Sequence, residues 1–246
     1  MRGRFPQHGS HLQRYAAGLP AVEINSSFYR PHRPATYARW AASVPPAFRF
    51  SVKIPKAITH EDRLVGPEHK LDAFLHQANA LSNKLGCLLI QLPPSLVFDA
   101  DTARRFFSAV RERYAGAAVL EPRHVSWAAT QCEELLQRFR IARVAADPPR
   151  LPDGSAPHGW RGLAYYRLHG SPQVYFSSYS DACLDALSVS IAAVARAGTP
   201  VWCIFDNTGL GAATCNAIEL FDRLASGAKD ADRGDRSSRK SSSSEA

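Results

Sequence analysis

Residues 21–30 read AVEINSSFYR, and this short stretch carries the pattern that decides the fold. It begins as an apolar β-strand in which Glu23 and Asn25 are two residues apart. Residues i and i+2 share one face of a strand, so these two polar side chains lie together while Val22 and Ile24 point the other way. The strand is therefore predicted to end at a polar surface that other elements help to build.

Strand-like and helix-like segments alternate along the rest of the chain. PATYARWAAS at 34–43 has Pro34 in its first turn and stops before Pro45, as helix signals predict. Such alternation predicts parallel strands joined by helical crossovers. The predicted strands are 21–25, 48–54, 86–92, 117–121, 141–145, 163–168 and 200–205, and the further helices are 69–86, 101–114, 126–139, 180–197 and 210–225.

Polar residues at the strand ends favour a closed barrel over an open sheet. No GxGxxG follows the first strand, so the fingerprint of a dinucleotide-binding fold is missing from the sequence. Active sites of (β/α)8 barrels lie at the carboxyl ends of the strands. We therefore predict an α/β fold of the TIM (β/α)8 type over residues 1–225. The polar strand ends are Glu23 and Asn25, Ser51 and Lys53, Glu121 and Arg123, Arg167 and His169, and Asp206.

The composition of the 246 residues is that of an ordinary globular protein. No apolar run approaches the roughly 18 residues of a membrane span, and the start MRGRFPQHGSHL lacks the apolar core of a signal peptide. The five cysteines never form a CxxC pair, which indicates reduced thiols and predicts no disulfide framework. These features predict a cytoplasmic protein that does not enter membranes.

The net charge of +8 belongs mainly to the body of the chain. Residues 226–246 hold five basic and four acidic residues, which leaves +7 on the remainder. A basic body attracts anions, including phosphorylated metabolites and nucleic acids. The segment 226–246 is rich in Ser and charge and has no aliphatic side chain larger than Ala, so we expect a disordered tail.

Seven motifs occur in an order that resembles the YecE-like family, domain of unknown function 72. They are VEINSSFYR, FRFSVKI, ITHEDRL, LLIQLPPS, EPRHVSW, YYRLHGS and FDNTGLGAATCNA. The resemblance extends from about residue 5 to 225 and implies a TIM barrel, but it implies no established activity. It also implies a first strand and a G-T-S-G-W loop, whereas this chain starts at MRGRFPQHG, inside that loop. We expect a barrel without its first strand, a gap beside strand 21–25, and a true start upstream.

Three of the polar residues are candidates for catalysis. Glu23 and Glu121 end strands that we place at one mouth, where paired carboxylates can divide acid and base roles. His169 follows a strand and could transfer protons. Alternatively, both carboxylates pair with cations in a structural network, because an unpaired buried charge is costly. Asn25 is expected to orient Glu23, and Lys53 to neutralise it.

The substrate-binding candidates at the same mouth are mostly cations and hydrogen-bonding side chains. HGSP and DNTGLGAA follow the last two strands, and phosphate sites of barrels often use these loops with a helix start. The glycines could equally serve only the turns. We predict binding of a small anion that can bear a phosphate, through Asn25, Lys53, Arg123, His124, Arg167, Asp206 and Asn207.

The sequence names no cofactor, metal or oligomeric state. His124 and His169 could ligate a metal beside Glu23, Glu121, Asp147 and Asp206, but no HxH or HExxH spacing supports this, so no metal ligand is predicted.

Two hypotheses of function follow. The first is an enzyme that acts on an anionic substrate at a mouth lined by Glu, His, Arg and Lys. The alternative is a non-catalytic nucleic-acid-binding protein that uses the basic face and loop aromatics such as Trp127 and Tyr175 to stack bases.

Overall fold

The computed structural model describes residues 5–241, with side chains described through residue 227. Its strands are β1 (Ala21–Ile24), β2 (Arg49–Lys53), β3 (Leu85–Gln91), β4 (Ala118–Glu121), β5 (Ile141–Arg143), β6 (Ala145–Asp147), β7 (His158–Gly159), β8 (Ala164–Leu168) and β9 (Val201–Phe205). The helices are α1 (His11–Ala16), α2 (Pro34–Ala42), α3 (Glu68–Ala78), α4 (Ala100–Arg113), α5 (Thr130–Arg138), α6 (Asp181–Arg196) and α7 (Ala212–Ser241). Short helical turns are η1 (Ser26–Phe28), η2 (Ala57–Glu61), η3 (Asn79–Lys84) and η4 (Val125–Ala128).

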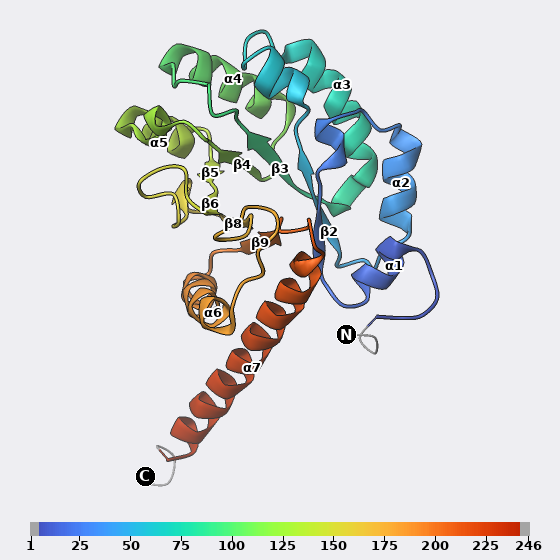
Figure 1. Ribbon diagram of the computed structural model, residues 1–246, viewed down its shortest axis with the longest axis vertical. Coiled ribbons are helices and arrows are strands. Elements are labelled where there is room, and N and C mark those ends of the chain that lie inside the picture. Colours follow the sequence, from blue (N-terminus) through green and yellow to red (C-terminus); the bar gives the residue numbers. More distant parts are fainter. Residues whose placement is uncertain (1–4, 242–246) are drawn as a thin grey trace.

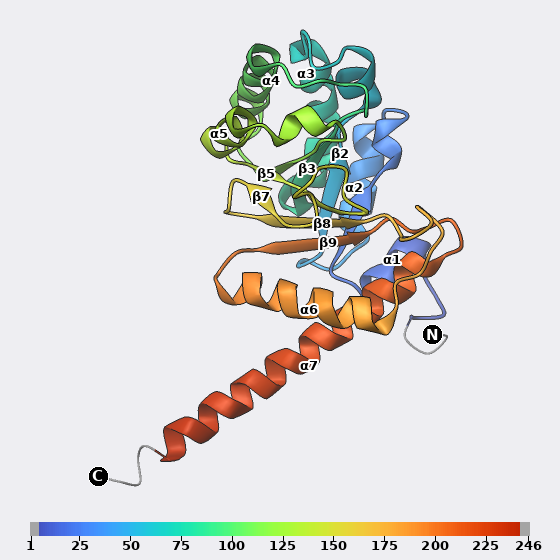
Figure 2. The ribbon, with the colours of Figure 1, turned by 60° about the vertical axis from the view of Figure 1, so that its left-hand side comes forward.

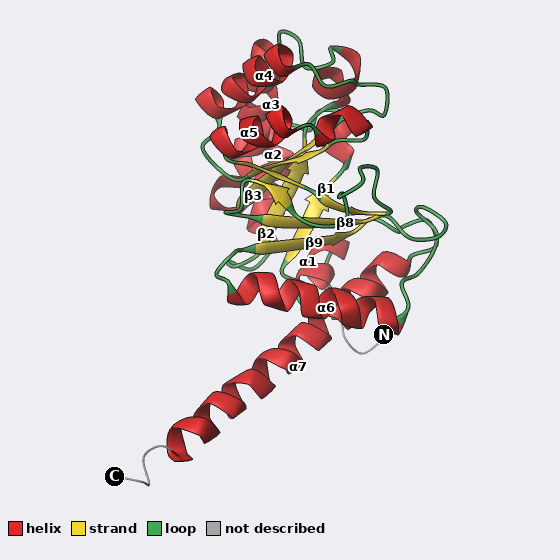
Figure 3. Ribbon diagram, turned by 90° about the vertical axis from the view of Figure 1, so that its left-hand side faces the viewer, coloured by secondary structure: helices red, strands yellow, loops and turns green. Residues whose placement is uncertain are grey.

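The strands form two hydrogen-bonded sheets. One has the order β1-β2-β3-β4-β5-β7, and the other has the order β6-β8-β9. All pairs are parallel except β5 with β7. Helices α2 to α5 lie on one side of the strands and α6 and α7 on the other (Figure 1; Figure 3). The alternation of strands and helices predicted from the sequence is thus confirmed as a mixed α/β fold.

Two details of the strands differ from the expectation. The predicted strand 141–145 is divided into β5 and β6, which belong to different sheets. A short antiparallel strand, β7, also pairs with β5. Val144 alone separates β5 from β6, so the chain passes directly from one sheet to the other.

The described strands do not close into a barrel. Over residues 5–241, β1 pairs only with β2, and β9 pairs only with β8. The two outer edges face a groove of about 690 Å³, whose lining includes Ala21, Glu23, Trp202 and Phe205. What is observed is therefore a parallel α/β arrangement that is open between β1 and β9.

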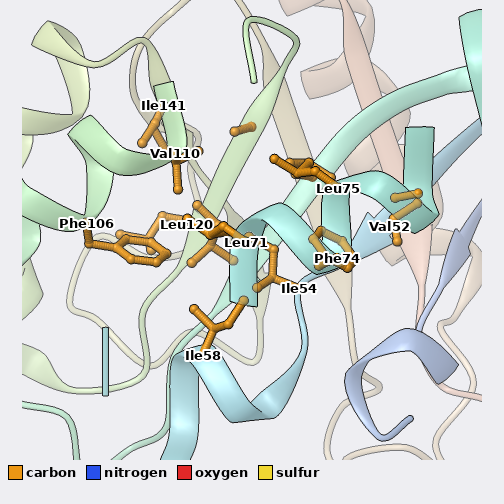
Figure 4. Close-up of a cluster of buried hydrophobic side chains, with 14 of the residues drawn as sticks. Val52, Ile54, Ile58, Leu71, Phe74, Leu75, Phe106, Val110, Leu120 and Ile141 are labelled. Atoms are coloured by element: carbon orange, nitrogen blue, oxygen red, sulfur yellow. The ribbon is translucent and has the colours of Figure 1, made fainter. Parts of the chain in front are cut away.

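An outer apolar core fills the space between the first sheet and helices α2 to α5 (Figure 4). Val52 and Leu120 point into it from the strands, and Leu71 and Phe106 meet them from the helices; all four side chains are fully buried. Burying one such side chain stabilises the fold by about 1.5–3 kcal/mol. Because strand side chains alternate, Lys53 and Glu121 are directed to the opposite, inner face.

The inner face of the strands is apolar at one end. Tyr165 of β8 stacks on Trp202 of β9, with ring centroids 6.0 Å apart and planes 12° from parallel. The buried members of this inner apolar cluster are Cys87, Leu89, Val119, Ala142, Val144, Leu163 and Tyr165. A third cluster packs α6 and α7 against β6, β8 and β9. These clusters leave the carboxyl ends of the strands free to carry polar groups.

The C-terminal segment differs from the sequence-based expectation over much of its length. Residues 226–241 continue α7, which projects away from the strands (Figure 2), whereas composition predicts disorder from residue 226. Extending an existing helix adds one hydrogen bond for each residue ordered and avoids the cost of nucleation. The last part of the expected tail, 242–246, lies outside the described residues.

Candidate active site

Arg167 is the centre of a buried ionic cluster on the inner face of the strands. It lies in β8, and Asp206 follows the neighbouring strand β9. Its Nη2 lies 2.7 Å from Oε1 of Glu23 and 3.0 Å from Oδ2 of Asp206. Its Nη1 donates to Oε2 of Glu121 at 3.0 Å. Burial alone would lower the pKa of Arg167, but these carboxylates outweigh it and hold the pKa well above its ordinary value.

Glu121 ends β4 and is 2% exposed. Besides Arg167, it meets Nε2 of His169 at 2.8 Å and Nη2 of Arg123 at 3.3 Å. Burial would raise its pKa, but the charge of Arg167 and the hydrogen bond from His169 lower it far below the usual 4.5. Glu121 is therefore an ionised carboxylate held by three cationic groups.

His169 lies between two carboxylates. Its Nε2 contacts Glu121, and its Nδ1 lies 3.1 Å from Oδ2 of Asp206. Burial lowers the pKa of His169, but the hydrogen bonds to Asp206 and Glu121 raise it above 6.5 overall. Burial raises the pKa of Asp206, but the hydrogen bond from His169 and the charge of Arg167 bring it below 3.8. Only the imidazolium form lets both ring nitrogens donate at the same time. The two carboxylates therefore hold the second ring proton of His169 in a position from which it can be transferred.

Glu23 has partners other than those expected. Arg167 binds it from β8 through Nε and Nη2, and the hydroxyl of Tyr165 donates to its Oε2 at 2.9 Å. The expectation that Asn25 orients Glu23 and Lys53 neutralises it is not met. Oδ1 of Asn25 is buried with no hydrogen-bond partner in the described part of the chain. Arg167 occupies the place expected for Lys53 because its planar guanidinium can serve several carboxylates at once.

Lys53 ends β2 beside this cluster and is 4% exposed. Its Nζ stands 3.9 Å from the ring centroid of Phe28. Burial, aided by the charge of Arg167, lowers the pKa of Lys53 to about 8 against the opposing effect of Glu121 and Glu23. Lys53 is thus the cation of the site that is least compensated.

Two predicted binding residues have local structural contacts instead. The ring Nδ1 of His124 accepts from the backbone N–H of Ser126 at 3.2 Å and caps η4. Asn207 donates through Nδ2 to the carbonyl of Ser177 at 2.9 Å and to Oδ1 of Asn216 at 3.0 Å. Through these contacts Asn207 ties the loop after β8 to α7. The residues joined in the cluster are Glu23, Glu121, Arg123, Arg167, His169 and Asp206, with Lys53 beside them.

Tyr165 is a site residue that the sequence analysis missed. Its hydroxyl contacts both Glu23 and Oγ of Ser51, each at 2.9 Å. The signal was its position two residues before Arg167, which places both side chains on one face of β8. Tyr175 closes the other side of the cluster, because its ring meets that of His169 edge to face at 5.9 Å.

Two cavities border the cluster. A small one of about 10 Å³ is lined by Glu121, His169, Arg123, Arg150 and Tyr175, among others. The groove between β1 and β9 reaches the opposite side, where Glu23, Asn25 and Asp206 line it. Among the described residues, no group of three or more His, Cys, Asp or Glu side chains is arranged to hold a metal ion. No helix in the described part of the chain is long and apolar enough to cross a bilayer.

Comparison with known proteins identifies relatives by sequence. A family model described as "Protein of unknown function DUF72" matches residues 3–241. The UPF0759 protein YunF of Bacillus subtilis is 29% identical over 175 residues, which cover 65% of this chain and 61% of YunF. The UPF0759 protein YecE of Escherichia coli K12 is 30% identical over 82 residues, or 33% of this chain and 30% of YecE. The matches thus span less than two thirds of either curated relative.

Solved structures are similar over most of the chain. A DUF72 family protein from Thermotoga maritima superposes with a TM-score of 0.72 and 26% identity, covering 89% of this chain and 92% of its own. One from Enterococcus faecalis gives 0.75 and 23%, covering 87% and 93%. These likenesses support the α/β fold described above.

Proposed function

The chain belongs to the family of proteins of unknown function DUF72, and we propose that this member is an enzyme that acts on a small anionic substrate at the Arg167 cluster. The proposed catalytic groups are Glu23, Glu121 and His169, and Lys53, Arg123 and Arg167 hold the anion. Asn25 and Asp206 line the groove beside the proposed anion-binding site.

The charge balance of the site carries this proposal. Glu23, Glu121 and Asp206 supply three negative charges. Arg123, Arg167 and the imidazolium form of His169 supply three positive charges, and the contacts of His169 with Glu121 and Asp206 favour that form. The ammonium of Lys53 would leave one positive charge in excess. Buried charge is costly unless it is compensated, so the site favours a ligand that brings one negative charge.

The groove also borders the N-terminal turn of a helix. It is lined by Asp206 and Thr208 and by Ala213 and Thr214 in the first turn of α7. Free N–H groups at a helix N-terminus favour anions, including phosphate. This supports the choice of an anionic substrate, with phosphate as one acceptable group.

Binding of small anions is the direct test. Thermal unfolding is measured with inorganic phosphate and a panel of small carboxylic and phosphorylated acids. We expect at least one anion to stabilise the wild type, Lys53→Met to lose that stabilisation, and Lys56→Met to keep it. Lys56 is a matched control because it lies three residues away and is exposed. No stabilisation by any anion, or full stabilisation of Lys53→Met, would contradict the proposal.

Catalysis is tested by measuring turnover of whichever acid stabilises the protein in the binding test. Glu121→Gln removes the charge of the carboxylate with little change in shape, so we expect the variant to fold and to lose turnover. Retained turnover would exclude Glu121 as a catalytic group.

Nucleic-acid binding is the less favoured function, because the cations of the cluster are buried. Phosphates of a nucleic acid are neutralised by accessible Lys and Arg side chains. Trp127, which the sequence offered as a stacking residue, is also buried, and its indole N–H donates to the carbonyl of Leu96 at 2.8 Å. Anisotropy of labelled DNA and RNA at two salt concentrations decides between the functions. Salt-sensitive binding that is lost in Lys53→Ala plus Arg167→Ala would favour the nucleic-acid alternative.

We further infer that the two sheets form a (β/α)8-type barrel that is open between β1 and β9. Contacts across the inner face support this: Glu23 on β1 meets Arg167 and Tyr165 on β8, although these strands belong to different sheets. The proposed domain ends near residue 225, and 226–246 lies outside it. The five free cysteines suit a reducing compartment, and we propose the cytoplasm.

A further inference from the structure

Lys53 differs from every other cation in the cluster because it is buried without a carboxylate partner. Within residues 5–227, no carboxylate oxygen lies within 4.0 Å of its Nζ, and its nearest described interaction is with the face of Phe28. Arg167, in contrast, is shared by three carboxylates. The ring face of Phe28 offers the amine a cation–π contact and no carboxylate.

The neighbouring carboxylates of Glu23 and Glu121 already accept hydrogen bonds from other residues. Both oxygens of Glu23 receive donors from Arg167, and Tyr165 adds another. Both oxygens of Glu121 receive donors from Arg167, Arg123 and His169. A charged Lys53 is therefore surrounded by carboxylates whose charge other cations have compensated.

This arrangement raises the fraction of neutral amine above that of an ordinary lysine. A buried ammonium without an adjacent partner is disfavoured, and positive groups nearby disfavour it further. Both effects operate on Lys53, because Arg167 and Arg123 each lower its pKa. Lysines activated by desolvation or by a second cation serve as nucleophiles toward carbonyl carbon.

We propose that Lys53 is the nucleophile of the site and forms an imine with an aldehyde or ketone that also carries an acidic group. This inference rests on the proposed function and narrows its substrate class to carbonyl acids. Under this proposal Lys53 is a catalytic residue that reacts with the substrate, in addition to binding its anionic group.

The proposed step balances without an oxidant or reductant. The lone pair of Nζ adds to the carbonyl carbon, so that a C–N bond forms and the π pair of the C=O bond moves to the oxygen, which takes a proton to give a carbinolamine. The nitrogen then passes one of its two protons to the hydroxyl, which restores the nitrogen lone pair. The nitrogen lone pair then expels the protonated hydroxyl as water and leaves an iminium. The overall change is amine plus carbonyl plus one proton giving iminium plus one water, and His169 is the proton donor that the cluster offers.

The charges of the site suit the product. With Lys53 neutral, Glu23, Glu121 and Asp206 balance Arg123, Arg167 and protonated His169. The iminium restores one positive charge, and the acidic group of the same substrate supplies one negative charge. The iminium also withdraws electrons, so a C–H bond on the adjacent carbon can release its proton to a base while the electron pair moves toward nitrogen to give an enamine.

Reductive trapping tests the imine on the full chain. The protein is incubated with pyruvate or glyoxylate and sodium cyanoborohydride, and the modified lysine is located by mass spectrometry of peptides. At pH 7, a lysine with a pKa of about 8 has roughly 300-fold more neutral amine than one with the ordinary value of 10.5. We therefore expect the adduct on Lys53 to form roughly 100- to 300-fold faster than on exposed Lys56.

Variants and a second readout separate the possible outcomes. Lys53→Arg keeps the charge and should abolish the adduct, whereas Lys56→Arg should not. The wild-type peptide map decides the matter even if a Lys53 variant fails to fold. Adducts spread evenly over surface lysines, or none on Lys53, would overturn the imine.

Thermal unfolding with the same two acids and with inorganic phosphate distinguishes this failure from failure of the proposed function. Stabilisation without an adduct on Lys53 overturns the imine and leaves the small-anion site standing. No adduct and no stabilisation by any of the three anions overturns both.

Discussion

The two ends of the inner strand face bury side chains of opposite character. At one end Leu89, Val119 and Leu163 form the inner apolar cluster, and at the other Glu121 and Arg167 form the ionic cluster. The apolar end is stabilised by removing surface from water, which needs no particular partner. The ionic end is stable only while each charge meets the opposite charge. The difference shows that the apolar end packs without specific partners, whereas each charge at the ionic end depends on its neighbours.

Arg167→Met should have the largest effect on stability. It leaves Glu23, Glu121 and Asp206 buried with fewer cationic partners, so we expect the free energy of unfolding to fall by about 3–5 kcal/mol. Urea denaturation at pH 7 measures the change. The control is Arg104→Met, which removes an exposed ion pair with Asp101. Equal stability of Arg167→Met and the wild type would contradict the view that Arg167 compensates the buried carboxylates.

Leu89→Ala tests the apolar end of the same face. Leu89 is fully buried, so the cavity and the lost apolar burial should cost about 2–5 kcal/mol. The substitution leaves the ionic cluster intact, and binding of a stabilising anion should therefore be unchanged. Loss of anion binding in folded Leu89→Ala would show that the two ends are coupled.

His169→Gln should have a smaller effect that depends on pH. The folded pKa of His169 lies above 6.5, so its stabilising contribution is complete below pH 6.5 and is lost as pH rises through the folded value. We expect wild-type stability to decline in that window and His169→Gln to show a flatter profile. Urea denaturation at several pH values between 6 and 9 measures this. His124→Gln, which alters a helix cap, should keep the slope of the wild type.

The carboxylates act on the acid side of the same profile. The pKa values of Glu121 and Asp206 are lowered on folding, so their contribution is present above their ordinary values of 4.5 and 3.8 and is lost as pH falls through the folded values. Stability from the ionic cluster should therefore be greatest between about pH 5 and 6.5.

Lys56→Ala should have the smallest effect. Its ion pair with Glu61 is 3.0 Å long, but the two side chains are 48% and 55% exposed. Water and salt screen such a pair, so we expect a change of about 0–1 kcal/mol. A larger loss of stability in urea denaturation would mean that exposure does not distinguish this ion pair from the buried ion pairs of Arg167.

The sequence predicted much of the site because strand geometry is local. Glu121 and Arg123, like Arg167 and His169, are two residues apart, and a period of two places each pair on one face. The carboxyl ends of parallel strands point the same way, so these pairs were expected to converge, and they do. His124 and Asn207 were grouped with them by position alone, and their side chains found nearby backbone partners instead.

The sequence by itself determined the strand and helix alternation, the polar strand ends and family membership, because each depends on short-range pattern or on motif order. Only the tertiary structure decided the pairing. Glu23 meets Arg167 across 144 residues of chain, and the strand expected over 141–145 is divided between two sheets. Lys53 was expected to neutralise Glu23, but Arg167 binds Glu23 instead, and Lys53 has no carboxylate partner among the described residues. Such choices depend on distances between strands that no local period encodes.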